Sequence, residues 1–108
     1  MKTGGTTVST HRLVALPSLL VNAFVLECEF PIEAIGDLAA ELSRARAAAA
    51  LLTAAGRSTH LVHSLYVPSE RRCVSVVEAP DIDTVHELIR RSRMGVVQVH
   101  PAITFAAG

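Results

Sequence analysis

The chain has 108 residues, of which 50% are hydrophobic and 19% are charged, so it can build one hydrophobic core but is too short for two domains. Its ten basic and ten acidic residues cancel, and this balance gives no support to nucleic acid or membrane as a partner. Aromatic residues are only 4% of the chain, so no organic cofactor is expected. Two cysteines are too few for a disulfide framework and favour a reduced protein of the cytoplasm.

Residues 1–20 are predicted to be a flexible tail that leads into a single domain, residues 21–106. The tail begins with a polar segment rich in glycine and threonine. The apolar run over residues 13–26 is shorter than the roughly 20 residues that a membrane span needs, and Pro17 and Asn22 interrupt it. This run is therefore interpreted as the approach to the first strand.

A first strand is predicted over residues 21–30, because apolar and polar residues alternate there. One face is largely apolar and includes Cys28, whereas the other carries Glu27 and Glu29. The face with the two carboxylates is expected to meet solvent, a pocket or a partner.

Residues 32–56 form the strongest predicted helix, because apolar residues recur there at three- and four-residue spacings and alanine has the highest helix propensity. Gly56 is placed to end this helix, and Asp37 is an alternative cap at its start. The predicted buried stripe consists of Ile35, Leu38, Leu42, Ala45, Ala49 and Leu52.

The second half of the chain predicts a hairpin, a helix and a last strand. Residues 59–67 and 72–78 are β-rich and flank a turn that contains Pro68. Asp81 is the predicted N-cap of the second helix, which ends in an arginine-rich turn before Gly95. The last predicted strand covers residues 96–105, and Pro101 within it indicates an edge position or a bulge.

This β-α-β-β-α-β order predicts an α+β fold, a ferredoxin-like sandwich in which two helices cover one face of a four-stranded antiparallel sheet. The crossover rule places the first strand beside the third at the centre of the sheet. The other face is left open. We expect it to join a second copy of the chain in a homodimer, or to build a pocket.

Histidines supply the first candidate metal ligands. His60 and His63 have a spacing that resembles a metal motif, but residues three apart on a strand point to opposite faces, so they are not expected to hold one ion unless His60 lies in a loop. On the open face, His63 would line a pocket near Glu27. On the helix-covered face it would be a core histidine, and the sequence leaves both interpretations open.

Two further pairs could carry chemistry. Asp83 and His86 are neighbours on the surface of the second helix, where they form either a site for one divalent ion or an ordinary solvated face. Cys28 and Cys73 are expected to lie close, because antiparallel pairing brings the end of the first strand to the start of the third. They are candidates for a soft metal site, a labile disulfide or two small buried side chains.

Three segments together resemble one family. FVLECEFP (24–31) is similar to its opening strand, HLVHSLYVPSERRCVSVVEAP (60–80) to its most distinctive hairpin, and DIDTVHELIRRSRM (81–94) takes the place of its second helix. The family is that of the small ferredoxin-like domains of unknown function typified by an actinobacterial nickel-binding protein. The likeness spans about residues 24–100.

The resemblance implies a homodimer that binds nickel or a similar divalent ion at its surface, for sequestration. Glu27, His63 and Glu78 fall on motif positions and are the metal ligands that it implies, beside the Asp83 and His86 pair. The sequence departs from the family pattern at Ser75, Pro101 and Cys28, where a cysteine, an acidic residue and an arginine are usual.

A second hypothesis is a cofactor-free enzyme or ligand carrier of the dimeric α/β-barrel type, a monooxygenase or isomerase. In it, His63 would act as general base or proton shuttle, and Glu27 would orient it or accept protons. The hypothesis requires both side chains to converge on one pocket of the open face. A third hypothesis is an interaction module that only dimerises.

Overall fold

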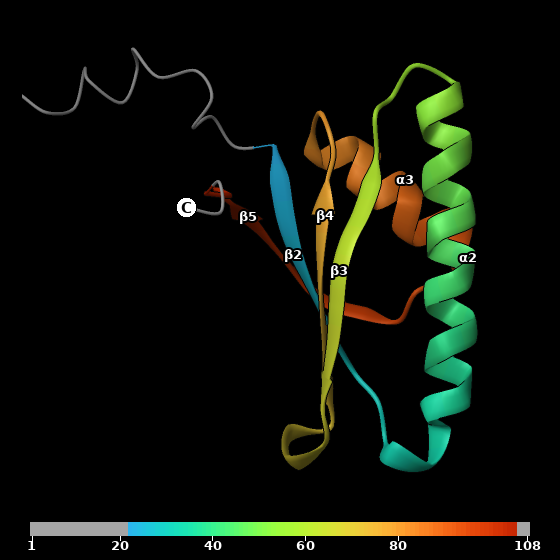
Figure 1. Ribbon diagram of the computed structural model, residues 1–108, viewed down its shortest axis with the longest axis vertical. Coiled ribbons are helices and arrows are strands. Elements are labelled where there is room, and N and C mark those ends of the chain that lie inside the picture. The colour runs from blue at the N-terminus through green and yellow to red at the C-terminus, as the bar shows by residue number, and fades with distance from the viewer. Residues whose placement is uncertain (1–21, 106–108) are drawn as a thin grey trace, which may run out of the picture.

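The computed structural model describes residues 22–105, so the predicted tail, residues 1–20, and both end residues of the predicted domain, 21 and 106, lie outside the described residues. The predicted succession of strands and helices is confirmed, although the last strand ends at Ala102 instead of residue 105. Figure 1 shows the elements β2 (Ala23–Glu29), α2 (Ile35–Ala54), β3 (His60–Val67), β4 (Arg72–Glu78), α3 (Ile82–Ser92) and β5 (Val96–Ala102).

The four strands form one antiparallel sheet in the order β3-β4-β2-β5. The prediction that the first and third strands pair at the centre is confirmed, because β2 and β4 are the inner strands. Their register sets Phe24 opposite Val77 and Cys28 opposite Cys73. β5 is an edge strand, one of the two positions that Pro101 indicated. The structure is an α+β fold with one antiparallel sheet and two helices.

Both helices lie against the same face of the sheet (Figure 1). The core between the layers joins Leu26 and Val77 of the sheet to Leu52 of α2 and Leu88 of α3, and each of these four side chains is at most 2% exposed. Full burial of an aliphatic side chain of this size stabilises a fold by roughly 1.5–3 kcal/mol. Neither helix of residues 22–105 has the length and apolar character to cross a membrane.

α2 confirms the predicted long helix, with differences at its first turn. The buried positions include Leu38 and Leu52, and Gly56 follows the helix at φ 90°, a conformation that glycine adopts without steric cost. The helix begins at Ile35, so Asp37 lies in the first turn and is not the cap. Ile35 itself is 44% exposed instead of buried, because it lines a surface groove between α2 and β3.

The buried face of α2 also contains a carboxylate that the apolar pattern did not predict. Glu41 is only 5% exposed, and its Oε1 accepts a hydrogen bond from the backbone N–H of Gly95 at 3.1 Å. Its Oε2 is buried and has no hydrogen-bond partner among the described residues. Glu41 therefore ties the loop before β5 to α2.

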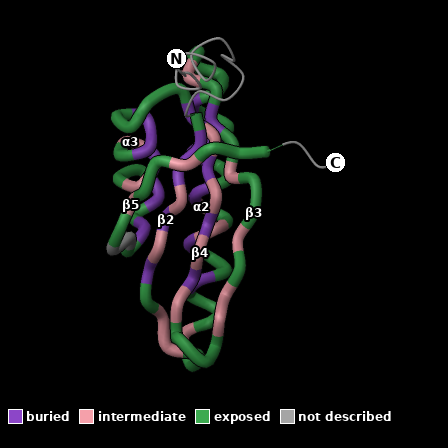
Figure 2. The backbone as a smooth tube through the Cα atoms, turned by 90° about the vertical axis from the view of Figure 1, so that its left-hand side faces the viewer, coloured by how far each residue is buried: buried purple, intermediate pink, exposed green. Residues whose placement is uncertain are grey.

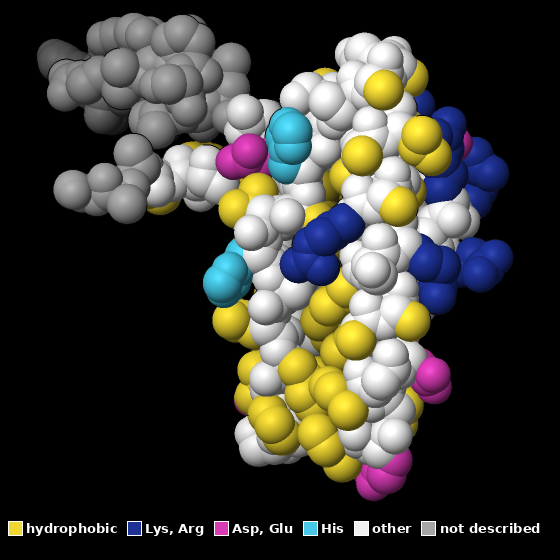
Figure 3. Space-filling model, turned by 45° about the vertical axis from the view of Figure 1, so that its right-hand side comes forward, with side chains coloured by type: hydrophobic (Ala, Val, Ile, Leu, Met, Phe, Trp, Pro, Cys, Tyr) yellow, Lys and Arg dark blue, Asp and Glu magenta, His cyan; other side chains and the backbone are white. Residues whose placement is uncertain are grey.

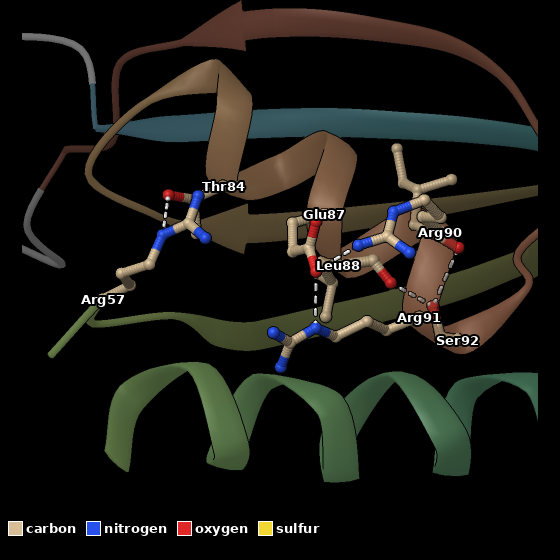
Figure 4. A network of polar contacts seen from close by, with 8 residues as sticks. Arg57, Thr84, Glu87, Leu88, Arg90, Arg91 and Ser92 are labelled. Carbon is tan, nitrogen blue, oxygen red and sulfur yellow. Dashed lines mark hydrogen bonds and ion pairs between the residues drawn. The ribbon is translucent and has the colours of Figure 1, made fainter. Parts of the chain in front are cut away.

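α3 is held by polar contacts at both ends. The predicted cap is confirmed, since the Asp81 carboxylate accepts from the backbone N–H of Thr84 at 2.8 Å and from its hydroxyl at 2.7 Å, which lowers the pKa of Asp81. Figure 4 shows Arg57, in the loop between α2 and β3, donating to the Thr84 hydroxyl. α3 ends at Ser92, and the residue that caps it is Arg93, with a left-handed φ of 55°, and not Gly95 as predicted.

The exposed side of α3 carries an arginine–glutamate network. The Glu87 carboxylate accepts from Arg90 and Arg91, one turn further along the helix (Figure 4). These two hydrogen bonds lower the pKa of Glu87 to about 2. Glu87 is therefore ionised at any pH near neutrality.

The other side of the sheet has no helix over it among the described residues, and we call it the open face (Figure 2). Antiparallel register places alternate residues of each strand on it. Val25, Val74 and Val76 of the inner strands are partly buried at its centre, and Leu65 of β3 beside them is 51% exposed. Glu27 lies on this face too, because its register partner is Val74.

Candidate functional site

The polar centre of the open face is Glu27 of β2. Its Oε1 accepts a hydrogen bond from Nη1 of Arg72 on β4 at 2.9 Å, and its Oε2 lies 3.3 Å from Nε2 of His100 on β5. Its side chain is 24% exposed. Both carboxylate oxygens therefore already face nitrogen atoms of the two neighbouring strands.

Two more side chains extend this cluster. Nη2 of Arg72 lies 3.6 Å from Oε2 of Glu29, and Nε2 of His100 lies 3.0 Å from Oε1 of Gln98. The sequence did not single out His100. Its contact with Glu27 depends on the register of β5 against β2, which pairs His100 with Val25, and no residue pattern predicts that register.

The position of His63 is settled by the register of β3 against β4. His63 is the partner of Val76, which lies on the open face, so the interpretation as a core histidine is wrong. It is exposed to solvent. His63 therefore faces the open side of the sheet, as one of the two interpretations required.

A β-bulge corrects the prediction for His60. His60 pairs with Glu78 and Leu61 with Val77, but the next partner, Val76, belongs to His63, so Val62 is the extra residue of the bulge. The extra residue cancels the change of face that a three-residue spacing produces in a regular strand. His60 and His63 therefore lie on the same face, beside Glu78.

These three residues are side by side on the sheet without forming a preassembled site. Directly opposed residues of an antiparallel pair have Cβ atoms about 5 Å apart, and diagonal neighbours are about 7–8 Å apart. The Nε2 atom of His60 instead lies 3.3 Å from the Ser58 hydroxyl. No group of three His, Cys, Asp or Glu side chains among residues 22–105 is arranged as metal ligands.

The donor set nevertheless suits a borderline divalent ion. Imidazole nitrogen binds nickel, copper and zinc well, and carboxylate oxygen completes many such sites. His60, His63 and Glu78 provide two such nitrogens and a carboxylate on adjacent strands.

The five residues predicted as metal ligands fall into separate places. Asp83 and His86 are exposed on α3, in the helix layer, whereas Glu27, His63 and Glu78 lie on the open face. Glu27 and His63 are separated by β4 and by two positions along the strands, which corresponds to a Cα separation of about 12 Å. Asp83 and His86 therefore cannot contribute ligands to a metal site on the open face.

The enzyme hypothesis requires His63 and Glu27 to line one pocket, and the surface hollows do not provide it. One hollow, of about 400 Å³, lies between α2 and the start of β3 and is lined in part by Arg46, Thr53 and His60. A smaller one, about 170 Å³, includes His60 and Glu78. Neither Glu27 nor His63 lines these two hollows, the groove between α2 and β3, or a hollow beside Glu29 and Arg71. The enzyme hypothesis thus has no pocket shared by its two residues among those four.

The two cysteines lie together, as the pairing argument predicted. Cys28 and Cys73 are register partners, both are buried, and each is a free thiol. Burial first, and then the adjacent Cys73 thiol and the Glu41 carboxylate, raise the pKa of Cys28 to about 12. Cys28 is therefore fully protonated at neutral pH.

Comparison of the chain with protein-family models, with curated proteins and with solved structures finds no match.

Proposed function

We propose that the chain is a homodimeric, ferredoxin-like domain that binds a divalent metal ion, nickel or a similar ion, for sequestration. The observation that carries the metal proposal is the bulge at Val62, since it brings His60 and His63 to one face beside Glu78. Two imidazoles and one carboxylate form a donor set that nickel and zinc accept. Glu27 is not in this first ligand set, because Arg72 already neutralises it.

The ferredoxin-like assignment rests on strand order and connectivity. The order β3-β4-β2-β5, with one helix after the first strand and one after the third, supports it. Both helices on one face leave the other face without a cover among the described residues (Figures 1 and 2). The apolar centre of that face, Val25, Val74 and Val76 with the exposed Leu65, supports self-association there.

Calorimetric titration with nickel chloride tests the metal proposal. We expect binding tighter than millimolar that weakens as the pH falls through about 6.5, because protonated imidazole cannot bind a metal. His63→Ala and Glu78→Gln should each weaken binding at least tenfold. His86→Ala, a histidine of the helix layer, is the matched control and should have no effect. Millimolar binding, or binding that survives both His63→Ala and Glu78→Gln, would remove the proposal.

Sedimentation velocity tests the dimer. Val74→Lys places a charge at the apolar centre of the open face and should convert the dimer to a monomer. Leu51→Lys is the matched control, because Leu51 is 64% exposed on α2 and away from the sheet. A wild-type chain that is monomeric at micromolar concentration, or a Val74→Lys variant that remains dimeric, contradicts the proposal.

A further inference from the structure

The two cysteines form a paired unit beneath the helices. Cys28 of β2 and Cys73 of β4 are direct register partners, and they are 3% and 1% exposed. They pack with Leu38 of α2 in a small cluster of their own, apart from the main core. The backbone N–H of Phe30 donates to the carbonyl of Arg71 two positions further along the same register, so Cys28 and Cys73 are also a hydrogen-bonded pair. The Cα atoms of such a pair are about 5.5 Å apart, which lies inside the 4.4–6.8 Å range of disulfides.

A chain of polar contacts leads from this pair to the edge of the sheet. The Cys73 thiol lies 3.9 Å from the hydroxyl of Ser75, and that hydroxyl is hydrogen-bonded at 2.8 Å to the hydroxyl of Ser64 on the edge strand β3. Hydroxyl groups both donate and accept hydrogen bonds. The chain Cys73–Ser75–Ser64 can therefore pass a thiol proton outward.

A groove reaches Cys73 from the outside. It has a volume of about 210 Å³, lies between the first half of α2 and β3, and has Cys73 and Ser64 in its wall. Figure 3 shows hydrophobic side chains gathered between the sheet and α2 on this side of the molecule. Cys28 does not line the groove. The other lining residues are Ile35, Leu38, Ala39, Leu42, Leu65 and Tyr66.

We propose that Cys28 and Cys73 are a dithiol–disulfide exchange site, which takes small, neutral, linear disulfides through the groove. Cys73 is the thiol that meets the small molecule, and Cys28 is the resolving thiol behind it. The apolar wall of the groove selects against charged disulfides. This inference is independent of the metal proposal, because the pair lies on the helix-covered side of the sheet.

The exchange proceeds in two balanced steps. The Cys73 thiol loses its proton through Ser75, and its sulfur attacks one sulfur of the small disulfide, which forms a mixed disulfide and releases one small thiol. The Cys28 thiol then loses its proton and attacks Sγ of Cys73, which closes the Cys28–Cys73 bond and releases the second small thiol. Two electrons pass from the protein to the small disulfide, and two protein protons end on the two released thiols.

The burial of Cys28 makes the second step the slow one. Its raised pKa leaves little thiolate at neutral pH, and thiolate is the attacking species. The first step should therefore be trapped when Cys28 is absent. The rate of ring closure in the wild type should rise about tenfold per pH unit above neutrality, since the thiolate fraction rises in that proportion.

The test uses the full reduced chain and 2-hydroxyethyl disulfide under native conditions, with intact mass and thiol counting as readouts. The chain has only two cysteines, so both readouts are unambiguous. We expect the wild type to gain one hydroxyethylthio group transiently and to end two hydrogens lighter with no adduct, and dithiothreitol to reverse the change. Cys28→Ser should gain one hydroxyethylthio group, whereas Cys73→Ser should remain unmodified over the same time.

Two variants of α2 test whether the small disulfide reaches Cys73 through the groove, in chains that are folded. Ala39→Leu narrows the groove and should slow exchange at least tenfold, whereas Ala40→Leu, on the neighbouring exposed position of α2 outside the groove, should leave the rate unchanged. Circular dichroism verifies that each variant is folded. Any of three results would overturn the proposal. The folded wild type keeps both thiols, the two single-cysteine variants are modified equally, or Ala39→Leu and Ala40→Leu react at equal rates.

Discussion

Deletion of Val62 is the sharpest perturbation of the β3 bulge. A one-residue deletion inside a strand normally moves every side chain on one side of it to the other face of the sheet. Here the deleted residue is the extra one, so Leu61 remains opposite Val77, and His63 remains opposite Val76. The strand becomes regular, and His60 and His63 stay on the open face.

The expected cost of this deletion is small. Val62 is 53% exposed, so only about half of the roughly 1.5–3 kcal/mol of a fully buried aliphatic side chain is lost, about 1 kcal/mol. Deletion of Ser64 is the matched control, because it removes the bond to Ser75 and changes the face of the residues on one side. If the Ser64 deletion turns Leu61 away from the core, the free energy of unfolding falls by the cost of losing the core contacts of a large side chain, about 2–5 kcal/mol.

Urea denaturation measures both free energies of unfolding, and a nickel titration of the folded variants reads the metal site. We expect the Val62 deletion to lose about 1 kcal/mol and to keep wild-type nickel affinity, and the Ser64 deletion to lose at least about 2 kcal/mol. If the two deletions destabilise the fold equally, or if the folded Val62 deletion no longer binds nickel, the assignment of the bulge and of the shared face is wrong.

The remaining predictions concern the helices. Leu52→Ala, at a residue with no exposed surface, should lower the free energy of unfolding by about 2–5 kcal/mol, whereas Leu51→Ala next to it should change it by less than about 0.5 kcal/mol, both by urea denaturation; similar losses would contradict the packing of α2. Asp81→Ala removes the cap that binds the Thr84 N–H and should lower the free energy of unfolding measured in urea, and Asp81→Asn should recover most of the loss if capping is the cause. Because the folded pKa of Glu87 lies at about 2, below its usual 4.5, its stabilising contribution is complete above about pH 4.5 and is lost as the pH falls towards 2; an NMR titration that returns a value near 4.5 would refute the network.

Much of the architecture could be read from local patterns. The alternation around Phe24 and Leu26, the three- and four-residue spacing that buries Leu38 and Leu52, and the cap residue Asp81 all act within a few residues of the chain. Such features depend on strand and helix geometry alone. The central pairing of the first and third strands followed from the order of elements and from the short hairpin.

The candidate site was less accessible to such reasoning, because it depends on register. A single bulge residue, Val62, decides that His60 shares a face with His63, and no residue type marks it. The contact of His100 with Glu27 likewise needs the register of β5, which comes from the other end of the chain. Glu41 was missed for another reason: a carboxylate is usually on the surface, and only the loop before β5 explains its burial.

The central claim is that His60 and His63 bind one metal ion together on the open face, and imidazole NMR tests it most directly. Stoichiometric zinc, a diamagnetic ion that imidazole also binds, is added to ¹⁵N-labelled protein, and the ring nitrogens of each histidine are followed. We predict that the ring signals of His60 and His63 shift together and saturate at one equivalent, while those of His86 and His100 do not move. Shifts at His86 instead, or no shift at either β3 histidine, would contradict the account.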